Sequence, residues 1–168
     1  MKKIKRLILV RHAKADRSID FINDIERPLT MQGYSDAIKV SHELRQLKIV
    51  PDQIISSTAI RAYTTAMIVA NDINFPLSRI ELNHSLYLAG TENYISIIRT
   101  AGKHTDTLML AGHNPDMEDL VSSISGKAES FPTMGICVVT IKSKSWKKFK
   151  PESCKIEKVI KPKSLKSL

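Results

Sequence analysis

Two short apolar runs, far apart in the chain, each lead into a histidine. Residues 7–10 (LILV) are followed by Arg11 and His12, and residues 108–111 (LMLA) lead, one glycine later, to His113. Each run has the length and composition of a buried strand. In open α/β sheets, ligands bind in the crevice outside the carboxyl ends of the strands. The pattern therefore predicts that both histidines reach one binding site.

Strand-like and helix-like segments alternate along the rest of the chain. Helices are expected near residues 30–47, 57–73, 93–101 and 115–125, and further strands near residues 53–56, 136–141 and 154–160. Thr30, and Ser57 with Thr58, are the expected N-terminal caps. The alternation predicts an α/β fold, a three-layer sandwich whose mostly parallel central sheet carries helices on both faces. We expect a single domain over residues 1–160 and a basic tail over residues 161–168.

Composition excludes several classes of protein. No stretch approaches the roughly 18 apolar residues of a membrane span. The N-terminal apolar run stops at Arg11, which argues against a signal peptide. Cys137 and Cys154 fit no metal-binding spacing, so no metal site is expected. We expect a cytoplasmic protein.

The net charge of +9 is concentrated near the C-terminus. From Lys142 onward there are ten lysines and two glutamates, so the body of the chain is nearly neutral. We interpret this end as a solvated, partly frayed tail. Nucleic-acid binding is not favoured, because the chain has one tryptophan and no aromatic residues interleaved with the lysines.

Two arginines accompany the histidines. Arg11 places a planar, permanently charged fork beside His12, and Arg61 lies in the first turns of a predicted helix, whose N-terminus favours anions. A phosphoryl site needs several positive donors that converge from separate elements. Arg11, Arg61 and His113 meet that need, and we expect inorganic phosphate or sulfate to bind there.

Some polar residues have structural alternatives. Asn114 is a candidate for substrate binding; it either orients its loop or caps the following helix, and the cap is favoured. Arg27 either approaches the pocket or anchors the loop over residues 14–27 through an acid such as Asp24, and the anchor is favoured. The remaining histidines lack comparable neighbours and are interpreted as surface or core residues: His42, His84 and His104.

Four motifs in order resemble the histidine phosphatase superfamily, and more narrowly its SixA-like phosphohistidine phosphatase branch. They are LVRHA at residues 9–13, RPLT at residues 27–30 with Gly33, SSTAIRA at residues 56–62 with Thr65 and Ala66, and AGHNP at residues 111–115. The resemblance implies a fold like that of phosphoglycerate mutase and chemistry without a metal or cofactor. It also implies that His12 is the nucleophile that becomes phosphorylated, and that Arg11, Arg61 and His113 form the phosphate pocket.

One departure from the superfamily affects the expected substrate. Many members carry an acidic residue between the second arginine and the second histidine, but the corresponding stretch here, residues 83–88, has none. Glu81 and Glu92 flank this stretch, and Asp16 lies in the loop after the first strand. General acid catalysis contributes roughly 10²–10⁴ in rate, so its absence should handicap alkyl phosphate esters. Phosphohistidine loses imidazole, a better leaving group, and depends less on an acid.

The leading hypothesis is a metal-independent phosphohistidine phosphatase. Its substrate would be a phosphohistidine-bearing protein, such as a phosphotransfer domain or phosphocarrier, and His12 would form a covalent intermediate. One alternative is a phosphatase of small-molecule phosphate esters. A second alternative, from a different class, is a non-catalytic module that binds phosphoproteins.

Overall fold

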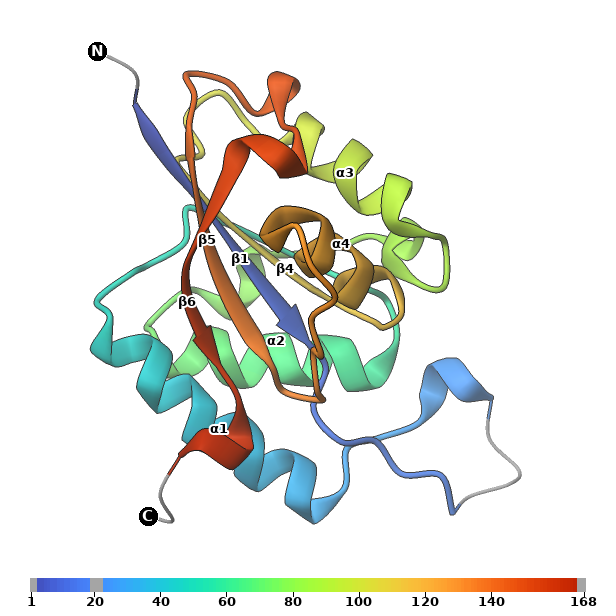
Figure 1. The fold of residues 1–168 in the computed structure, drawn as a ribbon. Helices are drawn as coiled ribbons and strands as arrows, with labels where there is room; N and C mark the ends of the chain where they lie inside the picture. The colour runs from blue at the N-terminus through green and yellow to red at the C-terminus, as the bar shows by residue number, and fades with distance from the viewer. Residues whose placement is uncertain (1–2, 19–22, 166–168) are drawn as a thin grey trace.

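A six-stranded sheet lies between two layers of helices in the computed structural model, which describes residues 3–18 and 23–165 (Figure 1). The strands follow the order β3-β2-β4-β1-β5-β6 across the sheet. Their bounds are Ile4–Arg11 for β1, Gln53–Ser56 for β2, Ile80–Leu82 for β3, Thr107–Gly112 for β4, Ile136–Lys142 for β5 and Cys154–Ile160 for β6.

The sheet is mostly parallel, as predicted. The pairs β3–β2, β2–β4 and β4–β1 are parallel. Strand β5 is antiparallel to both β1 and β6. Strand β3 was not predicted. It is three residues long and lies at the edge of the sheet, where most of its side chains are exposed. It therefore lacks the continuous run of apolar residues by which a buried strand is predicted.

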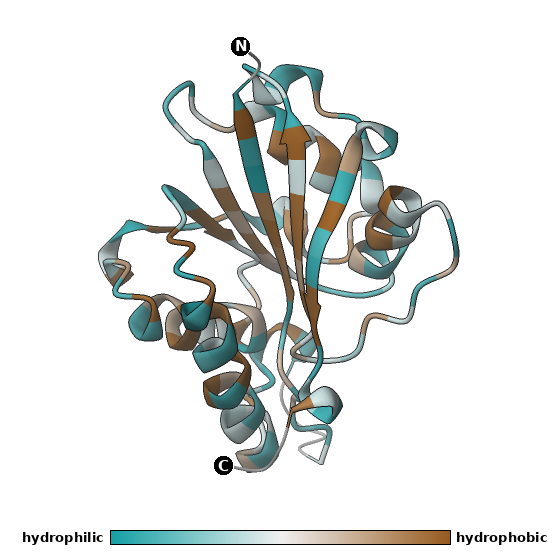
Figure 2. Ribbon diagram, turned by 60° about the vertical axis from the view of Figure 1, so that its left-hand side comes forward, coloured by the Kyte–Doolittle hydropathy of each residue, from teal (hydrophilic) through white to brown (hydrophobic). Residues whose placement is uncertain are grey.

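Four α-helices cover the two faces of the sheet. Their bounds are Met31–Gln46 for α1, Ile60–Asp72 for α2, Thr91–Thr100 for α3 and Asp116–Ser125 for α4. Leu7 and Leu9 pack in the cluster that contains α3 and α4, and Ile8 and Val10 pack in the cluster that contains α1 and α2. Successive strand side chains point to opposite faces, so a strand covered on both sides is apolar throughout. Figure 2 shows hydrophobic colour over the larger part of the central strands, with teal or pale bands between the brown stretches.

The register between β1 and β4 sets the position of the site. Arg11 pairs with Gly112 at the carboxyl ends of the two parallel strands. The next residues, His12 and His113, therefore leave the sheet side by side. The backbone N–H of His12 continues the ladder, because it donates to the carbonyl of Gly112 at 3.0 Å.

The predicted caps are partly confirmed. Thr30 caps α1, since its side chain accepts from the backbone N–H of Gly33. The prediction for α2 is wrong: its N-cap is Ala59, which makes no side-chain cap bond. The hydroxyl groups of Ser57 and Thr58 bond instead to the rings of His113 and His84, at 2.8 Å in each case.

The lysine-rich end is not frayed over most of its length. Residues 154–160 form the edge strand β6, and Trp146 and Phe149 are buried beneath the lysines around them. Leu165 packs against the core, and its carbonyl accepts from Lys39 of α1 at 2.9 Å. The predicted boundary at residue 160 stays a prediction, and residues 166–168 lie outside the described part. Over the described residues, no helix combines the length and apolar character needed to cross a membrane.

We predict that Gly33→Ala destabilises the fold and displaces the loop after β1. A Cβ at Gly33 would lie 2.3 Å from the carbonyl oxygen of Lys14. Relieving such a clash in a packed region costs about 1–3 kcal/mol. Urea unfolding should show the loss, and Ser35→Ala, an exposed change in the same helix, should not. Equal midpoints for the two variants would contradict this prediction.

Candidate functional site

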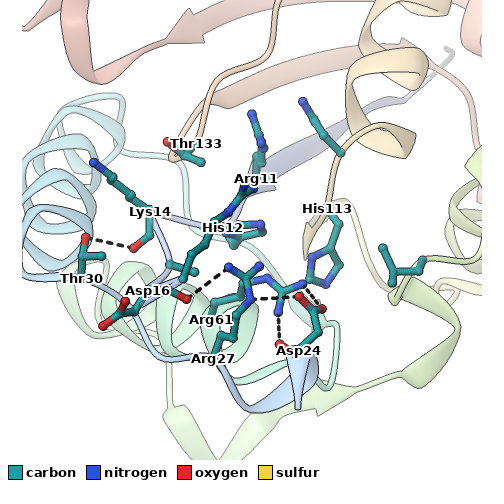
Figure 3. A pocket seen from close by; sticks show the side chains of 14 residues that line it. Arg11, His12, Lys14, Asp16, Asp24, Arg27, Thr30, Arg61, His113 and Thr133 are labelled. Carbon is teal, nitrogen blue, oxygen red and sulfur yellow. Dashed lines mark hydrogen bonds and ion pairs between the residues drawn. The ribbon is translucent and has the colours of Figure 1, made fainter. Parts of the chain in front are cut away.

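A cavity of about 880 Å³ opens at the carboxyl ends of β1 and β4. Arg11, His12, Arg61 and His113 all line it, as Figure 3 shows. Arg11 ends β1, His12 and His113 follow β1 and β4, and Arg61 lies in the first turn of α2. The structure thus brings together the four residues on which the predicted phosphoryl site depends.

The ring of His12 is held in one tautomer. Its Nδ1 lies 2.7 Å from the carbonyl oxygen of Ala13. A carbonyl only accepts, so Nδ1 carries the proton and the lone pair of the neutral ring is on Nε2. Burial, with further contributions from Arg61 and Arg11, lowers the pKa of His12 to about 4. At neutral pH this residue therefore has an unprotonated Nε2, as a nucleophile requires.

His113 is held by two hydroxyl groups. Its Nε2 lies 2.8 Å from the Oγ of Ser57, and its backbone N–H donates to the hydroxyl of Tyr94 at 2.9 Å. The ring centroids of His12 and His113 are 5.2 Å apart. Burial lowers the pKa of His113 to about 3, with smaller contributions from His12 and Arg61. Both histidines are therefore neutral near pH 7.

Three buried nitrogens around the cavity have no hydrogen-bond partner among the described residues. They are Nε of Arg11, Nε of Arg61 and Nδ1 of His113. The other nitrogens of the two guanidinium groups are partly engaged: Arg11 donates to the carbonyl of Phe131, and Arg61 donates to Asp24. An unmatched buried donor costs about 1–3 kcal/mol. An oxyanion in the cavity would supply the acceptors that these groups lack.

The expected contact between Arg27 and Asp24 is present. Nε of Arg27 donates to Oδ1 of Asp24 at 2.9 Å, and Nη1 donates to the carbonyl of Asp16 at 3.2 Å. Arg27 also lines the cavity, so anchoring the loop does not remove it from the site. Its charge remains available to a bound anion.

Asn114 does not cap α4. The N-cap is Pro115, and the side chain of Asn114 donates to Glu118 at 3.1 Å and to the carbonyl of Phe131 at 2.9 Å. Its amide therefore bonds to a side chain of the first turn of α4 and to the loop at Phe131, and not to the backbone of the helix. Asn114 lines the cavity but uses both bonds to fix the loop at Phe131.

Among the described residues, the carboxyl groups that line the cavity are those of Asp16 and Asp24. Hydrogen bonds from Ser18 lower the pKa of Asp16. The hydroxyl of Tyr87, followed by Arg61, lowers the pKa of Asp24 to about 2. Both groups are ionised near pH 7 and have no proton to donate.

The two glutamates that flank residues 83–88 do not line the cavity. Glu81 accepts from Gln53 at 3.0 Å, and Glu92 is an exposed residue in the first turn of α3. Neither is placed as a general acid.

Three residues that bond to His113 or Asp24 were not predicted from the sequence. Ser57 was assigned to a helix cap, and Tyr94 and Tyr87 were not considered. Tyr87 donates to Asp24 at 2.6 Å, and its ring centroid lies 5.5 Å from that of His113. Tyr87 lies within residues 83–88, the stretch without an acid, and its hydroxyl group is the sequence signal for this contact.

Known proteins share both sequence and fold with this chain. The family described as histidine phosphatase superfamily (branch 1) matches residues 7–84. An uncharacterised protein of Mycobacterium tuberculosis, Rv1276c, is 33% identical over 143 residues, which cover 79% of this chain and 87% of that protein. An uncharacterised chloroplastic protein of Arabidopsis thaliana is 29% identical over 152 residues, or 84% of this chain and 69% of that protein.

Solved structures extend the similarity over nearly the whole chain. SixA of Agrobacterium tumefaciens has a TM-score of 0.80 and 27% identity, and the match covers 94% of this chain and 98% of that one. The protein histidine phosphatase SixA complexed with tungstate has a TM-score of 0.81 at 21% identity, with 96% and 99% covered. A mycobacterial glucosyl-3-phosphoglycerate phosphatase has the same fold at a TM-score of 0.66 and 12% identity, with 92% and 98% covered.

We predict that the free energy of unfolding decreases as the pH falls from about 7 to about 4. Unfolded histidine takes up a proton near pH 6.5, whereas folded His12 and His113 have pKa values of about 4 and about 3. The unfolded state therefore binds more protons over this range and gains stability. Urea unfolding between pH 7 and pH 4.5 should show a smaller decrease for His113→Gln than for the wild type. Identical pH dependence would contradict the assignment.

Proposed function

We propose that this chain, which belongs to the histidine phosphatase superfamily and its SixA-like branch, removes phosphate from phosphohistidine on a partner protein. Its class as a phosphatase follows from the family. The phosphohistidine substrate and the role of each residue are our proposal. One observation carries it: the cavity places a neutral histidine with an open Nε2 among buried cationic and neutral donors that lack acceptors.

The arrangement suits phosphoryl transfer in two steps. In the first, Nε2 of His12 attacks phosphorus, the phosphorus–nitrogen bond of the substrate breaks, and the substrate ring, protonated at its other nitrogen, leaves as neutral imidazole. In the second, water attacks the phosphorus on His12, which releases inorganic phosphate and restores the free ring. Each step needs the negative oxygens of the phosphoryl group to be neutralised.

Arg11, Arg61 and His113 are the groups we assign to those oxygens. The two guanidinium groups have free N–H donors in a fixed planar arrangement, which suits phosphate. If the hydroxyl of Ser57 donates its hydrogen bond to Nε2 of His113, the ring proton of the neutral histidine is on Nδ1. This is the atom that has no partner among the described residues. A neutral His113 would then act as a hydrogen-bond donor to the phosphoryl group. Arg27 adds positive charge at the edge of the cavity.

The ionised carboxylates favour phosphohistidine over alkyl esters. Expelling an alkoxide benefits from a proton donor, and neither Asp16 nor Asp24 has a proton to give near pH 7. Imidazole leaves without this help. The likeness to the phosphohistidine phosphatase SixA of Agrobacterium tumefaciens supports phosphohistidine as the substrate.

The partner and ligands follow from this chemistry. We propose a phosphohistidine-bearing protein, a phosphotransfer domain or phosphocarrier, as substrate, because a cavity of about 880 Å³ that opens to solvent admits a side chain. Inorganic phosphate or sulfate should occupy the same place, in line with the tungstate in a SixA structure of the same fold. The described residues contain no group of three or more metal-ligating side chains.

We predict that kcat/KM is higher for a phosphohistidine peptide than for 3-phosphoglycerate. Among artificial esters, aryl phosphates with acidic leaving groups should exceed alkyl phosphates by roughly 10²–10⁴, the usual contribution of a general acid. His12→Ala should lose turnover of every substrate. Steady-state kinetics across leaving groups of graded pKa measures this dependence.

Glu92→Gln is the matched control, since Glu92 lies outside the cavity and should leave all rates unchanged. Similar rates for alkyl and aryl esters, reduced selectively in Glu92→Gln or Asp16→Asn, would favour the phosphatase of small-molecule esters. Tight binding of the phosphopeptide without any turnover would favour the non-catalytic module instead.

A further inference from the structure

Asp24 joins three separate parts of the chain at the cavity. It lies in a 3₁₀ turn, Asp24–Glu26, between β1 and α1. Its Oδ2 accepts from Nη2 of Arg61 at 2.9 Å and from the hydroxyl of Tyr87 at 2.6 Å, and its Oδ1 accepts from Nε of Arg27 at 2.9 Å. Figure 3 shows the carboxylate of Asp24 between Arg27 and Arg61.

The contact with Arg61 involves both backbone and side chain. The carbonyl oxygen of Asp24 accepts from Nη1 of Arg61 at 2.6 Å, while the carboxylate accepts from Nη2. The side chain of Arg61 is only 3% exposed, whereas that of Asp24 is 49% exposed. A half-exposed loop residue therefore holds both terminal nitrogens of a buried cation.

Holding these two nitrogens sets the direction of the remaining donors. A guanidinium group has five N–H donors in one rigid plane. Asp24 engages one on each terminal nitrogen of Arg61, and Nε has no partner among the described residues. Because the group is rigid, fixing one edge fixes the orientation of the N–H bonds that are left for a ligand.

We propose that Asp24 is a positioning residue for phosphoryl binding, which orients Arg61 toward the cavity that His12 lines. The ring of Tyr87 stacks near Arg61, 5.8 Å from its guanidinium carbon, and its hydroxyl fixes the carboxylate in turn. The proposal rests on the phosphoryl site proposed above, but not on the identity of the leaving group.

If Asp24 instead competed with phosphate for Arg61, its removal would change the affinity for phosphate in the opposite direction. A carboxylate in a phosphate pocket repels an incoming dianion, so a carboxylate that merely fills the place of phosphate would weaken binding. Since the pKa of Asp24 is about 2, Asp24→Asn removes a full negative charge at neutral pH. If Asp24 only competes with phosphate, this change tightens phosphate binding. If it positions Arg61, the change weakens binding despite the more favourable charge.

The experiment measures binding of inorganic phosphate by calorimetry, and kcat and KM with an aryl phosphate. We expect Asp24→Asn to weaken phosphate binding by up to roughly 100-fold, the size of loss that a misplacement of about 1 Å can cause, and to raise KM more than it lowers kcat. Tyr87→Phe, which removes one donor to Asp24, should give a smaller loss in the same direction.

Asp16→Asn is the matched control. It removes the same charge from the same cavity, but the carboxylate of Asp16 accepts from Ser18 and, within the described part of the chain, forms no hydrogen bond or ion pair with Arg61. It should leave phosphate binding equal or tighter.

The outcomes separate the two proposals. Phosphate binding by Asp24→Asn that equals or exceeds wild type overturns the positioning role, whatever the substrate. Weakened binding in this variant, together with a wild type that does not hydrolyse phosphohistidine, supports the positioning role and overturns the proposed function. A wild type that binds no phosphate overturns both.

Discussion

The parallel pairing of β1 with β4 is the constraint on which the site depends. Its register places Arg11 opposite Gly112, so His12 and His113 leave the sheet together. A shift of one residue would turn every side chain of β1 to the other face of the sheet. It would also separate the two histidines, whose ring centroids are now 5.2 Å apart. Burial of both strands under helices therefore defines how the two histidines lie relative to each other.

Burial also sets the protonation of this pair. Removing the rings from water disfavours their charged forms, which gives pKa values of about 4 for His12 and about 3 for His113. The positive charge of the site is therefore carried by its arginines and by Lys14, and not by the histidines. In the proposed mechanism these are two kinds of group with different tasks: a neutral nucleophile, and permanent cations for the phosphoryl oxygens.

The sequence predicted the parts of the site that local patterns encode. Continuous apolar runs identified β1 and β4, and the residues after them identified His12 and His113. The motif at residues 56–62 identified Arg61, at the beginning of α2, as a further residue of the site. Each of these signals lies within a few residues of the side chain concerned.

The missed contacts are those that join distant segments. Ser57 bonds to His113 across 56 positions, and Tyr87 bonds to Asp24 across 63. Ser57 precedes a helix, where a serine is typical of a cap, so its local context favoured another role. The short edge strand β3 was missed for a related reason, since half-exposed residues at an edge give no apolar run.

The central claim is that His12 accepts the phosphoryl group through Nε2. The most direct test is a rapid quench of the enzyme with a phosphohistidine protein, at alkaline pH to preserve the phosphorus–nitrogen bond, followed by mass mapping and ³¹P NMR. The account predicts a transient phosphoryl group on Nε2 of His12 that forms and decays as fast as turnover. A phosphoryl group on His113, or product formation with no phosphoenzyme on that timescale, would contradict it.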